Sequence, residues 1–120
     1  MNRRVIAAVS DMLFASKIRG TAEHINVTVD FARTADGLFD SAKTDLPALI
    51  ILDLHDTRLG PFELAARLKA DEQLRAVPLV GFFSHVETEL KRRAVEAGVE
   101  HVLPRSVFTR RLAEILGGEL

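Results

Sequence analysis

Short apolar runs alternate with longer amphipathic stretches along the whole chain. The apolar runs have the length of strands and cover 5–9, 27–31, 48–52, 77–83 and 101–103. The stretches between and after them carry apolar residues near helical spacing and cover 11–24, 34–42, 61–68, 84–98 and 107–116. Strands that alternate with helices are typical of a parallel sheet with helices on both faces. The pattern therefore predicts a single α/β domain over 1–120, doubly wound as (βα)5 with strand order 2-1-3-4-5.

Several of the predicted helices have recognisable start or end signals. Thr34 can cap the second helix, and Pro61 follows a glycine at the first position of the third, where proline is favoured. Ser84 and Glu87 have the spacing of a capping box for the fourth helix, which Gly98 ends. The apolar face expected for the first helix consists of Leu13, Ile18 and Ala22.

Composition excludes several classes of function. Hydrophobic residues make up 48% of the 120 residues, enough for a folded core. The 16 basic and 17 acidic side chains argue against general electrostatic binding to nucleic acid or membrane. The absence of cysteine excludes disulfides, thiolate catalysis and Cys-ligated zinc. The apolar run 5–9 is too short for a signal peptide or a membrane span, so we expect a cytoplasmic protein.

Polar side chains follow the predicted strands at the edge of the sheet where ligands of this architecture bind. Ser10 and Asp11 follow the first strand, and Asp53 follows the third. Two carboxylates from neighbouring strand ends suit Mg²⁺, which typically takes one or two carboxylates together with water and phosphate. Each carboxylate could instead cap a helix or begin a turn.

The order of these residues resembles a known family. Asp53 ends an apolar third strand, Pro78 opens the fourth, and Ala97-Gly98 ends the fourth helix. Arg105, a basic residue, stands seven positions after that glycine. Over essentially its whole length the chain resembles the receiver domain of bacterial two-component response regulators. The resemblance implies a flavodoxin-like fold and a role in phosphorelay signalling.

The resemblance assigns a role to each position of the receiver site. Asp53 occupies the position of the phosphoacceptor. The acidic pair that holds Mg²⁺ in receivers corresponds to Ser10 and Asp11, so one carboxylate remains. The hydroxyl-bearing residue at the end of the fourth strand corresponds to Phe83, which would put bulk where a phosphoryl oxygen binds. Ser84 is one residue late, and its expected role is the helix cap.

Two further positions depart from the receiver pattern. Arg105 stands where receivers place a lysine, and Val102 stands where they place an aromatic switch residue. Because a guanidinium can clamp a carboxylate with two hydrogen bonds, we expect Arg105 to hold Asp53 in place of the metal. Mg²⁺ binding through Asp11 and Asp53 should be weak. These departures predict a pseudo-receiver that acts mainly by protein–protein interaction and is not an enzyme.

Basic residues gather toward the end of the chain. The candidate interface consists of Arg92, Arg93, His101, Arg110 and Arg111. The face of the fourth helix, fifth strand and fifth helix is the usual dimerisation and output surface of receivers. We therefore expect a protein partner there, such as a histidine kinase, an output protein or a second copy of the chain. A nucleic-acid partner is disfavoured because the patch is small.

Two alternatives stay open. The chain could be a working Mg²⁺-dependent phosphoacceptor that is phosphorylated on Asp53, with Ser84 displaced into the hydroxyl role. It could also be a small flavodoxin-like enzyme, although no nucleophile–base pair or glycine-rich loop supports that interpretation. Asp53 and His55 partly match a cobalamin-binding signature, but Arg58 replaces the glycine of that signature.

Overall fold

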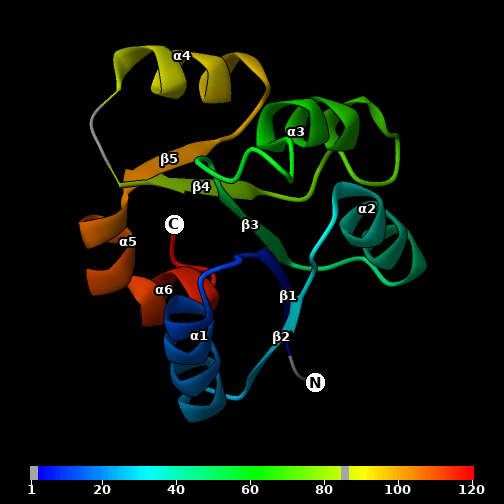
Figure 1. Ribbon diagram of the computed structural model, residues 1–120. Helices are drawn as coiled ribbons and strands as arrows, with labels where there is room; N and C mark the ends of the chain where they lie inside the picture. The colour runs from blue at the N-terminus through cyan, green and yellow to red at the C-terminus, as the bar shows by residue number, and fades with distance from the viewer. Residues whose placement is uncertain (1–2, 85–86) are drawn as a thin grey trace.

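The computed structural model describes residues 3–84 and 87–120. Its central sheet has five parallel strands in the order β2-β1-β3-β4-β5 (Figure 1). The strands are β1 (Arg3–Ala8), β2 (Val27–Phe31), β3 (Leu49–Asp53), β4 (Leu79–Phe83) and β5 (His101–Pro104). The predicted fold and strand order are confirmed.

The helices cover both faces of the sheet, as predicted. They are α1 (Met12–His24), α2 (Ala35–Thr44), α3 (Pro61–Ala70), α4 (Thr88–Glu96), α5 (Arg105–Arg110) and α6 (Leu112–Leu116). One apolar core lies between the sheet and α2, α3 and α4, and a second lies between the sheet and α1, α5 and α6. Figure 1 shows these two layers on opposite sides of the strands.

Side-chain alternation along the central strands builds both cores at once. Ile50 and Leu52 face the α2–α4 side, whereas Leu49 and Ile51 face the side of α1. All four are fully buried, which explains why β3 is an unbroken apolar run. On the α1 side, Phe14, Phe82 and Phe108 form an aromatic cluster with ring centroids 5.1–5.7 Å apart.

The first and last helices differ from the sequence prediction. Leu13 is 86% exposed and Phe14 takes its expected place in the core, because Phe14 lies one helical turn before Ile18. The predicted closing helix 107–116 begins at Arg105 and divides into α5 and α6 at Arg111, a residue outside helical geometry.

Helix capping is confirmed in two places and wrong in a third. The Thr34 side chain accepts a hydrogen bond from the Gly37 amide at 3.0 Å, and Pro61 occupies the first turn of α3. The capping box at 84–87 is wrong, because α4 begins at Thr88 and its N-cap is Glu87, without a side-chain hydrogen bond. Residues 85 and 86 of that box lie outside the described residues. In the described part of the chain, no helix is long and apolar enough to cross a membrane.

Candidate functional site at the carboxyl edge of the sheet

Asp53 is the last residue of β3 and begins a tight turn. Its Oδ1 accepts a hydrogen bond from the backbone amide of His55 at 2.9 Å, as expected for an aspartate that starts a turn. The next residue, Leu54, is buried and packs so closely on β4 that a Cβ on Gly81 would lie 2.8 Å from it. Glycine at that position therefore lets the loop after Asp53 anchor against the sheet.

Burial decides the electrostatics of Asp53. Desolvation raises the pKa of this carboxyl above the ordinary value, and the nearby charge of Asp56 adds to the effect. The His55 amide hydrogen bond, the charge of His55 and the charge of Arg105 act in the opposite direction. The net result is that the neutral form of Asp53 is favoured more than in an exposed aspartate.

Asp11 has both carboxylate oxygens engaged by the protein. Its Oδ1 accepts a hydrogen bond from the Phe14 amide at 3.1 Å and so caps α1. Its Oδ2 accepts a hydrogen bond from the guanidinium of Arg105 at 3.1 Å. The Phe14 amide and then Arg105 lower the pKa of Asp11. Asp11 is therefore the N-cap of α1, which confirms the alternative role expected for it from the sequence.

The predicted pairing of Arg105 with Asp53 is wrong. Arg105 is the first residue of α5, and its guanidinium carbon lies 4.1 Å from the centroid of the Phe14 ring. The ring face attracts the cation at the start of α1, where Asp11 is exposed and charged. Asp53 is half-buried and its ionised form is disfavoured, which makes it the weaker partner.

The end of β4 also differs from expectation. Phe83 does not fill the space beside Asp53; it is buried in the core with residues of α3 and α4. Ser84 is exposed and lies outside α4, so the helix-cap role expected for it is wrong. Val102, at the position of the switch ring, is half-buried and packs against the same core.

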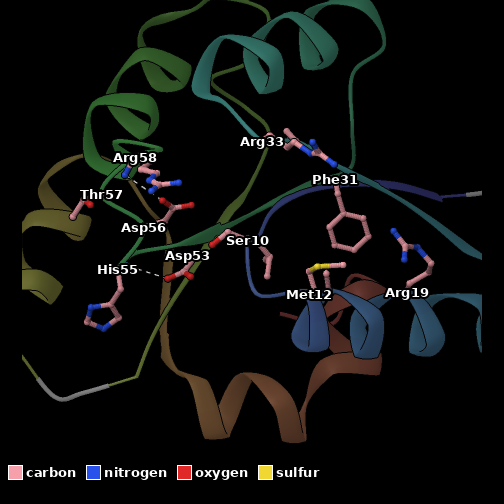
Figure 2. Close-up of a pocket in the computed structure, with 13 residues that line it drawn as sticks. Ser10, Met12, Arg19, Phe31, Arg33, Asp53, His55, Asp56, Thr57 and Arg58 are labelled. Atoms are coloured by element: carbon pink, nitrogen blue, oxygen red, sulfur yellow. Dashed lines mark hydrogen bonds between the residues drawn. The ribbon is translucent and has the colours of Figure 1, made fainter.

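An open cavity of about 810 Å³ lies beside Asp53. Its lining includes the ends of β1, β2 and β3 and the start of α1. Figure 2 shows Asp53, Asp56 and Arg58 on one side, Phe31, Met12 and Arg19 on the other, and Ser10 between the two groups. Sequence reasoning missed the contribution of β2, although the rule that ligands bind at strand ends applies equally to Phe31 and Arg33.

The metal site predicted at Asp11 and Asp53 stays a prediction. Within residues 3–84 and 87–120, no three histidine or acidic side chains lie close enough together to hold a metal ion. Of the two carboxylates, Asp11 is capped and ion-paired, and Asp53 has one oxygen in a turn hydrogen bond. A divalent cation would have to displace Arg105 to use Asp11 Oδ2.

The candidate interface is less positive than its sequence indicates. Arg92 forms ion pairs with Glu89 and Glu96 of its own helix, and Arg111 forms one with Glu114. Arg93 lies over the ring of Phe62 at 4.2 Å, and His101 is half-buried on β5. Arg110 is exposed. Whether this face binds a partner stays a prediction.

Comparison with known proteins indicates the fold. No family model and no curated protein matches the chain. A response regulator from Hahella chejuensis superposes with a TM-score of 0.89 at 19% identity, over 99% of this chain and 96% of the other. The chemotaxis response regulator CheY4 of Vibrio cholerae gives 0.83 at 17% identity, over all of both chains. The phosphorylated cyanobacterial phytochrome response regulator RcpA gives 0.79 at 17% identity, over 98% and 91%. The chain therefore has the fold of these response regulators.

Proposed function

We propose that this chain is a receiver-like domain of two-component signalling that acts by binding a protein partner, with the ordinary phosphoryl switch impaired. The fold of the response regulators and the position of Asp53 at the end of β3 support the signalling class. One observation supports the impaired switch most strongly: Arg105 forms an ion pair with Asp11, the one carboxylate at the positions of the acidic pair that holds Mg²⁺ in receivers.

The ion pair competes directly with a metal. Mg²⁺ needs oxygen ligands in near-ideal octahedral geometry and gains most from charged ones. Asp11 offers its second oxygen only when Arg105 leaves it. A metal at Asp53 would then lie near a guanidinium charge that repels it. Weak Mg²⁺ binding is the expected consequence.

The second support is the absence of a capturing hydroxyl at the end of β4. Phe83 is buried in the core, and Ser84, the residue after β4, is exposed. A ligand shifts an equilibrium between two states only by its differential affinity for them. Without a hydroxyl to bind, a phosphoryl group on Asp53 should interact about equally with the inactive and active states of the domain. It should therefore shift the equilibrium between them only slightly.

Replacing Arg105 tests the metal argument. Arg105→Ala should raise Mg²⁺ affinity roughly fivefold, since it frees one carboxylate oxygen and removes one nearby positive charge. Arg110→Ala is the matched control, because it removes the same charge from the same helix without touching Asp11. Calorimetric titration measures the Mg²⁺ affinity of wild type and of both variants. Equal Mg²⁺ affinity in wild type and Arg105→Ala, or tight Mg²⁺ binding by wild type, would contradict the proposal.

Phosphorylation tests the switch. Wild type is treated with Mg²⁺ and a small-molecule phosphodonor, and intact mass and sedimentation are measured on the same sample. We expect no change in oligomeric state, whether or not a phosphoryl group is added. A large change that is lost in Asp53→Asn would restore the conventional receiver.

The alternative of a working phosphoacceptor has one observation in its favour. Asp53 lines an open cavity, so a phosphodonor can reach it. Sedimentation of the phosphodonor-treated sample decides between the two functions, because a working switch should change the oligomeric state and Asp53→Asn should abolish that change.

The partner surface is best tested at Arg110. Arg92 and Arg111 are held in ion pairs, so reversing their charge would also disturb the helices that carry them. Arg110→Glu should weaken association with a histidine kinase, an output protein or a second copy, while the thermal midpoint stays nearly unchanged. Arg75→Glu, exposed in the loop before β4, is the control. Unchanged association in Arg110→Glu would place the interface elsewhere.

A further inference from the structure

The cavity beside Asp53 extends well beyond the aspartate itself. It runs from the β3–α3 loop to the end of β2 and the first turns of α1 (Figure 2). Its volume, about 810 Å³, falls in the range of small-molecule sites in proteins. Arg105 and the basic face of α4 and α5 do not line it. The cavity is therefore a feature distinct from the ion pair that impairs the switch.

Three arginines from three different elements line this cavity. Arg19 comes from α1, Arg33 from the segment after β2, and Arg58 from the β3–α3 loop. In the described part of the chain, the guanidinium groups of Arg33 and Arg58 form no ion pair or side-chain hydrogen bond with protein. Guanidinium forks of this kind match the geometry of phosphate and carboxylate.

The opposite wall of the cavity is apolar and aromatic. The guanidinium carbon of Arg19 lies 4.8 Å from the centroid of the Phe31 ring, so the two groups form a cation–aromatic pair at this wall. Met12 stands beside it with 84% of its surface exposed. Covering Met12 and the Phe31 surface with a planar apolar group would remove this area from water.

Two carboxylates in the same cavity restrict the choice of ligand. Asp53 and Asp56 each accept hydrogen bonds from backbone amides of the loop, and Asp56 Oδ1 accepts two, from Arg58 and Leu59. The second oxygen of each carboxylate can accept a further hydrogen bond, which suits a ligand with hydroxyl donors. The lining has three arginines and two aspartates, so its net charge is positive even with both acids ionised.

We propose that this cavity binds a small anionic ligand with a planar ring and hydroxyl groups, of the nucleoside monophosphate class. Arg33 and Arg58 hold the phosphate, the Phe31–Arg19 surface stacks on the ring, and Asp53 and Asp56 accept hydrogen bonds from the sugar hydroxyls. The proposal shares Asp53 with the signalling site but does not rest on the proposed function, because it uses neither Arg105 nor any protein partner.

Titration of the full chain with AMP, adenosine and inorganic phosphate tests the proposal, with amide shifts in NMR spectra as the readout. AMP should bind with a Kd between about 10 μM and 1 mM, at least roughly tenfold more tightly than adenosine or phosphate alone. The shifts should centre on Phe31, Arg33 and Arg58.

Substitution locates the binding. The double variant Arg33→Ala/Arg58→Ala should lose about tenfold or more in AMP affinity, since charge-assisted hydrogen bonds to the phosphate disappear. Arg75→Ala, an exposed arginine in the α3–β4 loop, should leave the affinity unchanged. The proposal is overturned by any of three results: no saturable AMP shifts at millimolar concentration, phosphate binding as tight as AMP, or full AMP affinity in the double variant.

Discussion

Replacing Phe83 by threonine, the change that would restore a hydroxyl at the end of β4, should strongly destabilise the domain. Phe83 is 6% exposed and belongs to the core beneath α3 and α4. Truncating a buried phenylalanine costs about 3–5 kcal/mol, and a threonine hydroxyl left without a partner in the core adds to that cost. The total stability of a domain is about 5–15 kcal/mol, so Phe83→Thr should remove a large part of it.

Equilibrium urea denaturation measures this loss. Phe83→Leu, which keeps most of the apolar volume, should cost less than about 1.5 kcal/mol with an unchanged m-value. Phe62→Thr is the matched control on α3, where the ring is half-buried under Arg93 and its loss should cost about 1–2 kcal/mol. A cost below about 1 kcal/mol for Phe83→Thr would show that the side chain is not part of the core.

Three other predictions concern stability. The pKa of Asp53 is raised by burial, so its contribution to stability is present below the unfolded pKa and is lost as the pH rises through the folded pKa. Asp53→Asn should therefore raise the thermal midpoint at neutral pH and lose that advantage below the ordinary aspartate pKa of 3.8, whereas exposed Asp40→Asn should change little at either pH by scanning calorimetry. Gly20→Ala should stabilise α1 by about 0.5–1 kcal/mol, since nothing lies within 4 Å of the new Cβ. Gly98→Ala should destabilise by more than about 1 kcal/mol, because Gly98 has φ of +100° and the Cβ would meet Lys69 at 2.7 Å; equal urea midpoints for the two glycine variants would refute this reasoning.

The fold was predictable because the signals that specify it are local and repeated. Each strand of the sheet is a short apolar run, and right-handed crossovers leave few ways to arrange five of them. The errors lie at element ends, where one residue changes the outcome. Leu13 and Phe14 are adjacent and both apolar, and only the register of α1 against the sheet decides which is buried. Glu87 rather than Ser84 precedes α4 because the loop after β4 is longer than the capping pattern assumes.

The location of the candidate site was predictable from the sequence, but the carboxylate with which Arg105 pairs was not. The strand-end rule brought Asp11, Asp53 and Arg105 to one edge, where the structure places them. Which of the two carboxylates pairs with Arg105 depends on how deeply each is buried. The sequence does not show that burial. Burial penalises the ionised form of Asp53, while Phe14 offers its ring face to Arg105 next to Asp11. The cavity was missed for the related reason that Phe31 and Arg33 carry no motif.

On the proposed function, Arg105 stands in place of a metal beside Asp11, and this changes what can control the domain. Occupancy by Mg²⁺ would depend on its concentration, whereas the guanidinium of Arg105 is part of the chain and pairs with Asp11 at any Mg²⁺ concentration too low to displace it. An equilibrium responds only to something that binds its two states differently. On the proposed function, chemistry at Asp53 supplies little of that difference. Control of the domain must then come from what binds its surface, a protein at the face that carries Arg110 or a small anion in the cavity beside Asp53.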